Sequence, residues 1–166
     1  MRLMTILLAL VMAGCTLTIG FDPTPAAPPA GGEEGVVTQV IDGDAIDVRL
    51  SSGVVRVRYI GINTPERDEP CYGDAQRANA GLVEGQQVRL VKDVSDTDRF
   101  GRSLRYVYVG STFVNRELVA QGWAEVVRYS PDTAYFETFR ALEQEAARAG
   151  RGCHPTGIFN DGTYER

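Results

Sequence analysis

The sequence predicts an α+β protein dominated by a β-barrel, a five-stranded OB-type Greek-key barrel with three α-helices. Three observations lead to this fold class. The chain has 166 residues, of which 43% are hydrophobic, which suffices for one domain with a packed core. Five β-rich runs are separated by short turn-forming segments. Stretches with helical spacing follow the third run and close the chain, an order that fits a small Greek-key barrel.

The β-rich runs begin with a three-stranded meander. Its strands are predicted at residues 36–41, 45–50 and 54–60, around the turns Asp42-Gly43-Asp44 and Ser51-Ser52-Gly53. An Asp-Gly pair between apolar runs is a strong hairpin signal. Two further strands are predicted at 87–92 and 103–108, and a short β-like stretch at 124–129.

Three segments carry helix signals. The first, residues 74–84, has Asp74 at the N-cap position and Gly85 beyond its end, as helix boundaries require. The second covers residues 112–121 and is closed by Gly122. The third opens at Ser130-Pro131 and stops at Gly150, and its apolar residues keep helical spacing. These residues are Tyr135, Phe136, Phe139, Leu142 and Ala146.

The N-terminal segment has the features of a targeting signal. Residues 1–14 contain Arg2 and an apolar run at 3–12, which is too short to span a bilayer and is typical of a signal peptide. Small residues directly before Cys15 resemble the lipobox of bacterial lipoproteins, so Cys15 is the expected lipid anchor. Simple secretion and an internal core helix are the alternatives.

Residues 15–35 follow as a Pro- and Gly-rich linker, which we expect to be extended. The globular domain is then predicted at 36–153, with a C-terminal tail at 154–166. This organisation indicates a protein outside the cytoplasm, anchored at the cell envelope through Cys15 or secreted. Nothing in the sequence suggests more than a monomer.

Composition excludes several functional classes. The formal net charge is −5, which argues against a polybasic nucleic-acid binder but leaves room for a local basic cleft. The single His removes His-rich zinc sites and most His-based catalytic triads.

Export would place the two remaining cysteines in an oxidising compartment, where a disulfide can form. Cys71 and Cys153 have no other partner, so we predict that they bridge. Two free thiols are the alternative.

Three clusters combine turn residues with charges that have no evident structural role. The first is Asp42-Gly43-Asp44, whose carboxylates could bind a hard cation such as Ca²⁺ or simply form a hairpin turn. The second begins with Arg58, whose positive charge would need an anionic partner inside a barrel. It continues to Glu66, which lies on the turn after Thr64-Pro65. A carboxylate held there suits general-base catalysis or is a solvated turn residue. The third is the turn at 96–102, where Arg102 could meet the same anion as Arg58.

Taken together, these strings resemble the staphylococcal-type, thermonuclease-like nuclease family. The resemblance runs from about residue 36 to 152, and its four motifs occur in family order. They are residues 40–44, residues 57–66, residues 98–102, and Phe113-Val114-Asn115 with Leu118 and Gln121-Gly122. The resemblance supports the five-stranded OB-type barrel with three helices.

The resemblance implies a calcium-dependent phosphodiesterase that cleaves DNA and RNA by in-line attack of water at phosphorus. In that family pattern Asp44, Asn63 and the Thr64 carbonyl would be the metal ligands, and Glu66 the base. Arg58 and Arg102 would hold the scissile phosphate and stabilise its charge. Arg99 and Tyr129 would contact the substrate; for Tyr129 the alternative is a core tyrosine.

Departures from the family pattern modify these expectations. Asn63 replaces the usual Asp, which removes a negative charge and should weaken calcium binding unless Asp42 or an extra water compensates. The chain between Glu66 and Tyr72 is shorter than in the best-known members, and Cys71 lies in it. Familiar members are basic and this chain is acidic, so we expect weak, salt-sensitive binding with a preference for single strands.

Two further readings stay open from the sequence. One is a catalytically inactive nuclease-like module that binds nucleic acid or a protein partner at the envelope, supported by Asn63 and the acidic composition. The other is an unrelated OB-type lipoprotein that binds a saccharide or a peptide.

Overall fold

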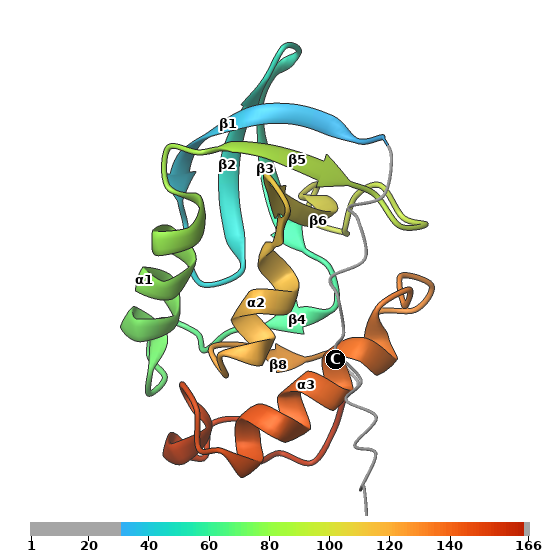
Figure 1. Cartoon of the computed structure of the whole chain (residues 1–166). Coiled ribbons are helices and arrows are strands. Elements are labelled where there is room, and N and C mark those ends of the chain that lie inside the picture. The colour runs from blue at the N-terminus through green and yellow to red at the C-terminus, as the bar shows by residue number, and fades with distance from the viewer. Residues whose placement is uncertain (1–30, 165–166) are drawn as a thin grey trace, which may run out of the picture.

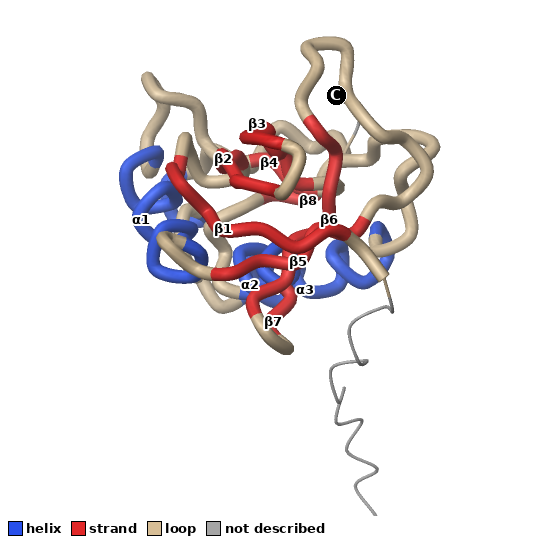
Figure 2. The backbone as a smooth tube through the Cα atoms, turned by 90° about the horizontal axis from the view of Figure 1, so that it is seen from above, coloured by secondary structure: helices blue, strands red, loops and turns tan. Residues whose placement is uncertain are grey.

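Five strands close into a barrel in the computed structural model, which describes residues 31–164 (Figures 1 and 2). The barrel strands are β1 (Glu33–Val40), β2 (Ala45–Leu50), β3 (Gly53–Tyr59), β5 (Gln87–Val91) and β6 (Ser103–Val109). Antiparallel pairing runs in the order β3-β2-β1-β5-β6, and parallel pairing of β3 with β6 closes the ring. The predicted fold class is therefore confirmed.

Three helices and three short strands complete the fold. They are β4 (Ile62–Asn63), α1 (Tyr72–Val83), β7 (Thr112–Phe113), α2 (Val114–Ala120), β8 (Glu125–Val126) and α3 (Phe136–Arg148). A single 3₁₀ turn follows at His154–Thr156. In Figure 1, α3 lies at the end of the molecule farthest from β1, with the antiparallel β4–β8 pair beside it.

The core fills the barrel and continues between the barrel and the helices. Alternate residues of the strands point inward, as the period of two requires, and the helices each add one apolar face. Fully buried members include Ile46, Val48, Val57, Tyr59, Val88, Leu90, Val107, Val83, Leu118 and Phe139.

Strand β1 starts at Glu33, three residues before the predicted start. Glu33, Glu34 and Gly35 pair antiparallel with β5, so the last residues of the predicted linker belong to the barrel. The predicted signal peptide (residues 1–14), the predicted lipid anchor Cys15 and residues 15–30 of the predicted linker lie outside the described residues.

Helix α1 begins at Tyr72, two residues before the predicted start, because Asp74 is not its N-cap. The carbonyl of Cys71 accepts the N–H groups of Asp74 and Ala75 at 3.1 and 3.0 Å, so Cys71 occupies the capping position. Asp74 falls in the first turn instead and forms an ion pair with Arg77, where an acidic side chain complements the helix dipole.

The second predicted helix is shorter than expected at its start. Thr112 and Phe113 pair with β6 instead, and the ring of Phe113 stacks on that of Tyr108 with centroids 4.5 Å apart. Cross-strand aromatic pairs of this kind stabilise a hairpin, so helix α2 starts only at Val114.

The third predicted helix also starts late, at Phe136 rather than at Ser130-Pro131. The preceding loop binds other parts of the chain instead of forming helical hydrogen bonds. The Asp132 carboxylate accepts the N–H groups of Val94 and Ser95 at 2.9 and 2.7 Å, and the N–H of Ala134 donates to Asp93. The periodic apolar residues of α3 are nevertheless those the sequence indicated, with Phe136 and Phe139 on its buried face.

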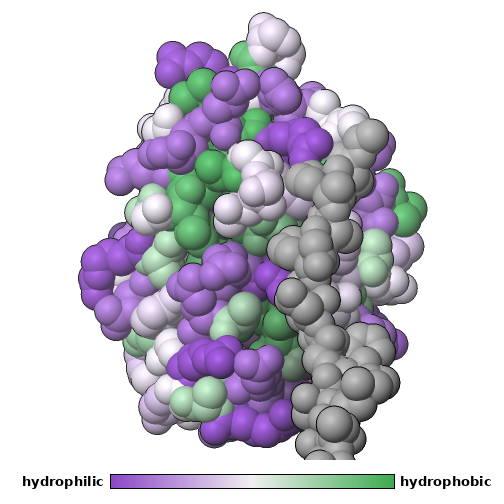
Figure 3. Space-filling model, in the orientation of Figure 1, coloured by the Kyte–Doolittle hydropathy of each residue, from purple (hydrophilic) through white to green (hydrophobic). Residues whose placement is uncertain are grey.

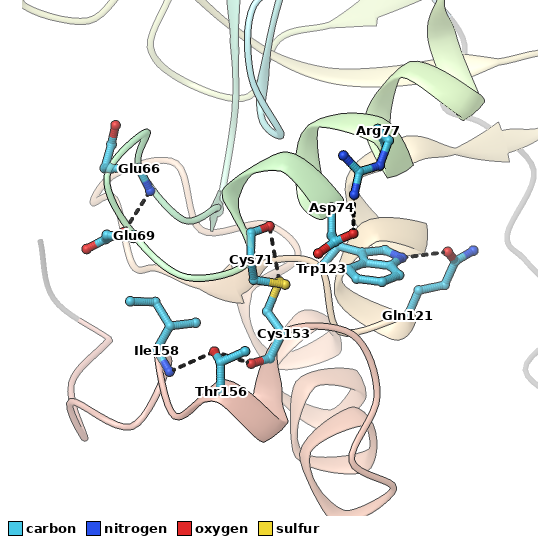
Figure 4. Close-up of a disulfide and its surroundings, with 10 residues drawn as sticks. All are labelled: Glu66, Glu69, Cys71, Asp74, Arg77, Gln121, Trp123, Cys153, Thr156 and Ile158. Carbon is cyan, nitrogen blue, oxygen red and sulfur yellow. Dashed lines mark hydrogen bonds and ion pairs between the residues drawn. A yellow bond between two sulfur atoms is a disulfide. The ribbon is translucent and has the colours of Figure 1, made fainter.

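A disulfide joins Cys71, just before α1, to Cys153, just after α3, as predicted (Figure 4). Close backbone approach brings the C-terminal segment to this point. The N–H of Cys153 donates to the Gly122 carbonyl at 2.9 Å, and a Cβ at Gly152 would lie 2.4 Å from that same oxygen. Only glycine fits there, so Gly152 lets the segment reach Cys71.

The face in Figure 3 carries many hydrophilic residues, with hydrophobic ones between them. Among residues 31–164, the large apolar side chains that are exposed are Val36, Val54, Val94, Phe100 and Tyr129. None of the helices in that range has both the length and the apolar character needed to cross a membrane.

The first prediction concerns the disulfide. It spans 82 positions, so its removal in the Cys71→Ala/Cys153→Ala variant should lower the unfolding free energy by about 4 kcal/mol through chain entropy. Urea denaturation measures this change. Because Cys71 has a positive φ of 73°, Cys71→Gly/Cys153→Ala should recover about 1 kcal/mol of the loss. A loss below 1 kcal/mol in the first variant would contradict the predicted stabilisation.

The second prediction concerns Glu143, a buried carboxyl on α3 that accepts the Val126 N–H at 2.9 Å. Burial, together with the nearby charges of Glu125 and Asp161, raises its pKa to about 7. A raised carboxyl pKa stabilises the fold at low pH, and this contribution is lost as the pH rises towards 7.

We therefore expect Glu143→Gln, which keeps the acceptor oxygen, to gain stability relative to the unmodified protein between pH 5 and pH 8. The gain should be about 1 kcal/mol. Thermal or urea unfolding of both proteins at each pH measures it. A constant difference across that range would show that Glu143 does not titrate there.

Candidate functional site

The candidate site is built around Arg58, near the end of β3. Arg58 is 6% exposed. The NH1 group donates to the carbonyls of Tyr59 and Ile62 at 2.9 and 2.8 Å. The NH2 group donates to Asn63 Oδ1 at 3.1 Å and lies 3.1 Å from Asp44 Oδ2. Arg58 therefore joins the barrel to the β4 segment.

Asp44 is the buried acidic partner of Arg58. It follows the Asp42-Gly43 turn into β2, and the Asp42 carboxylate accepts its N–H at 3.1 Å. Its own Oδ2 accepts the Thr64 N–H at 2.8 Å. The Thr64 side chain packs against Gly43, where a Cβ would lie 2.7 Å from it, so glycine at 43 permits this approach.

Burial disfavours the charged form of the Asp44 carboxyl. Burial raises its pKa to about 7, Asp42 adds to the rise, and Arg58 and the Thr64 hydrogen bonds offset only part of it. Buried carboxylates of this kind are stabilised by a cation.

The oxygen groups here suit a hard divalent cation. The candidates are the Asp44 carboxylate, the Thr64 carbonyl and the Asn63 amide oxygen. Among residues 31–164, no three His, Cys, Asp or Glu side chains are arranged to hold a metal ion. A cation bound at Asp44 would therefore depend on backbone, amide and water oxygens for most of its ligands, which Ca²⁺ and Mg²⁺ accept.

Asn63 has two side-chain partners that the sequence did not indicate. Its Oδ1 accepts from Arg58, and its Nδ2 donates to Glu125 Oε1 at 2.9 Å. Glu125 lies on β8 directly opposite Asn63 in the strand pairing. Sequence reasoning missed Glu125, because a contact between two-residue strands 62 positions apart leaves no periodic signal.

Arg102 and Arg99 lie beside Arg58 in one cleft of about 340 Å³. Phe100 and Tyr129 also line it. Phe100 is 69% exposed, and the guanidinium carbons of Arg99 and Arg102 lie 4.7 and 5.5 Å from its ring centre. The structure thus gathers three of the predicted cationic residues and an aromatic that sequence reasoning passed over, although an aromatic within a charged turn is a usable signal.

Asp98 holds Arg102 in place. Its Oδ2 accepts the Arg102 Nε–H at 2.6 Å, and its Oδ1 accepts the N–H groups of Phe100 and Arg102 at 2.9 Å each. Partial burial raises the pKa of Asp98, but these hydrogen bonds outweigh burial and bring it below its ordinary value. The terminal nitrogens of Arg102 lie outside this contact, and a planar guanidinium can meet a phosphate with two parallel bonds.

Glu66 lies on an exposed loop, in a second pocket of about 220 Å³. Asn63, Glu125 and Tyr129 line the same pocket, and Tyr129 also lines the arginine cleft, so the two hollows adjoin. The Glu66 N–H donates to Glu69 Oε2 at 2.7 Å, and the disulfide lies at the end of this loop (Figure 4). Cys71 therefore limits the freedom of the segment that carries Glu66.

Comparisons with known proteins show which family the chain resembles. The family model described as staphylococcal nuclease homologue matches residues 56–153. The chain is 40% identical over 116 residues to the SPbeta prophage-derived endonuclease YokF of Bacillus subtilis, covering 65% of this chain and 39% of the relative. It is 39% identical over 130 residues to protein ParB of Escherichia coli, covering 72% of each.

A thermonuclease of Staphylococcus hyicus is 34% identical over 118 residues, covering 68% of this chain and 70% of the relative. The chain therefore spans most of the length of some relatives, but only 39% of YokF and 55% of the Bacillus subtilis endonuclease YncB.

The third prediction separates the structural role of Arg58 from that of Arg102. Arg58→Ala leaves Asp44 buried without its partner and should lower the unfolding free energy by about 3 kcal/mol. Arg102→Ala removes a half-exposed ion pair while Asp98 keeps its backbone hydrogen bonds, so the loss should stay near 1 kcal/mol or below. Urea denaturation compares the two. Equal losses would show that Arg58 does not hold the site together.

Proposed function

The chain belongs to the staphylococcal nuclease family, and from this premise we propose that it is a nuclease that hydrolyses phosphodiester bonds of nucleic acid. The observation that carries the proposal is the cleft in which Arg58, Arg99 and Arg102 lie beside Phe100 and Tyr129. Guanidinium groups bind phosphate oxygens, and exposed aromatic rings stack on bases. The phosphates and the bases of a nucleic acid strand would therefore both have binding groups in this cleft.

The proposed mechanism assigns a role to each side chain by its position. Arg102, with its terminal nitrogens outside the Asp98 contact, binds the scissile phosphate and stabilises the charge that grows on its oxygens. Arg58 adds positive charge at the base of the cleft. Glu66 accepts the proton of the attacking water from the adjoining pocket, and Arg99 and Tyr129 position the strand.

We propose Ca²⁺ as the cofactor, held by Asp44, the Thr64 carbonyl and the Asn63 amide oxygen. Bound there, the ion would polarise the phosphate and lower the pKa of water. Support comes from the all-oxygen groups and from the buried Asp44 carboxylate, which lies next to the Asp42 carboxylate in the turn. The acidic net charge of −5 supports salt-sensitive binding and a preference for single-stranded DNA and RNA.

We also propose that the protein acts outside the cytoplasm as a monomer, anchored by a lipid on Cys15 or secreted. The apolar segment before Cys15 supports export, and the Cys71–Cys153 disulfide is of a kind that forms in oxidising compartments.

The fourth prediction tests the reaction. The purified, oxidised protein should cleave single-stranded DNA and RNA in millimolar calcium and not in chelator. Arg102→Ala and Glu66→Gln should each lower kcat/KM by about 10²- to 10⁴-fold, because they remove charge stabilisation and the base. Gel or fluorescence assays of initial rate measure these effects.

Glu69→Gln is the matched control, because it lies in the same loop and its amide oxygen can still accept the Glu66 N–H. Its rate should stay within about threefold of the unmodified protein. Binding of single strands without cleavage by the unmodified protein would replace the proposal with a non-catalytic binding module.

A further inference from the structure

The Asn63 side chain lies in a chain of four polar groups. In order these are the Asp44 carboxylate, the Arg58 guanidinium, the Asn63 amide and the Glu125 carboxylate. The Asp44–Arg58 and Arg58–Asn63 contacts are each 3.1 Å, and the Asn63–Glu125 contact is 2.9 Å. Asp44 and Glu125 are 5% and 4% exposed. The chain therefore runs through the interior from the turn at β2 to strand β8.

The partners at each end of the amide determine its orientation. A guanidinium can only donate hydrogen bonds, and a carboxylate can only accept them. Only a side chain with one acceptor and one donor satisfies both Arg58 and Glu125. The Asn63 amide does so with Oδ1 towards Arg58 and Nδ2 towards Glu125.

An aspartate at position 63 would not fit this arrangement. It would place a carboxylate against the buried Glu125 carboxylate, and like charges directly opposite in a strand pair are destabilising. Asn63 and Glu125 are opposite each other in the pairing of β4 with β8, so a carboxylate at position 63 would lie beside that of Glu125. The amide is thus the complement of Glu125.

We propose that Glu125 is a positioning residue of the nuclease site, which orients the Asn63 oxygen and supplies the negative charge that a carboxylate at position 63 would otherwise provide. This inference rests on the proposed function. Its consequence is specific. Exchanging the acid at position 125 and the amide at position 63 together should preserve the site, whereas changing either position alone should impair it.

The placement of Glu125 supports a role at the site. Glu125 and Asn63 line the same pocket as Glu66, so the pair borders the space assigned to the attacking water. The backbone register of β4 with β8 sets the Glu125 position, so a change in its charge acts on the site without a loop having to move.

The fifth prediction is a cycle of three variants: Asn63→Asp, Glu125→Gln and the double variant. Asn63→Asp alone should lower the Tm by about 5 °C and kcat at least tenfold. The double variant reverses acid and amide, because the new amide at position 125 can donate to the new carboxylate at position 63. It should return to within about 2 °C of the Tm and within threefold of the kcat of the unmodified protein.

Calcium binding, measured by isothermal titration calorimetry without substrate, provides a readout independent of cleavage. Glu125→Gln keeps the acceptor for Asn63 but removes one charge, so it should weaken calcium binding about threefold or more. Glu143→Gln is the matched control: it is a buried acid on α3 that bonds Val126 rather than Asn63, and it should change calcium affinity less than 1.5-fold.

The outcomes separate the two proposals. Failure of the double variant to recover either Tm or kcat, or a Glu125→Gln affinity equal to that of Glu143→Gln, would overturn the role of Glu125 while leaving a cleaving enzyme in place. If the unmodified protein cleaves nothing, the proposed function fails, and the unfolding and calorimetric cycles still decide whether Glu125 and Asn63 act as one unit.

Discussion

The buried guanidinium of Arg58 is the interaction on which the geometry of the candidate site depends. Through two carbonyls, Asn63 and Asp44, it holds the end of β3, the β4 segment and the turn before β2 in one arrangement. A charge in this position is costly to desolvate, and a buried pair adds little net stability. Its effect is to specify which groups meet, because no apolar residue could make these four contacts.

Charge is distributed unevenly in this molecule, which makes an acidic chain compatible with the anionic substrate that we propose. The formal net charge is −5, yet Arg58, Arg99 and Arg102 converge on one cleft. Net charge governs encounter at a distance and is screened by salt, whereas the local cluster governs contact. In the proposed function, this cluster of arginines and the aromatic side chains Phe100 and Tyr129 bind the strand together.

The elements best predicted from the sequence are those specified by local signals. The hairpin of β2 and β3 follows from turn residues and alternation, and the sequence motifs indicate Arg58, Arg99 and Arg102, which line one cleft. Failures arose where distant contacts determine local structure. Asp132 binds the backbone at 94–95 and delays α3, Cys71 replaces Asp74 at the start of α1, and the partner of Asn63 lies 62 positions away. No property of the separate segments reports such pairings.

Position-by-position comparison therefore misjudges a site of this kind when it considers one residue at a time. Considered alone, Asn63 in place of an aspartate removes one negative charge and should weaken binding of the proposed cation. When Asn63 is considered with Glu125, its partner in the β4–β8 pairing, the negative charge lies on the neighbouring side chain instead. The amide oxygen and the amide nitrogen of Asn63 then each have a hydrogen-bond partner. A cation responds to the summed field of all nearby groups, and this field falls off gradually with distance. The unit that would satisfy the proposed cation is thus the chain of polar groups from Asp44 through Arg58 and Asn63 to Glu125. The effect of a substitution in this chain therefore depends on the partner of the substituted residue.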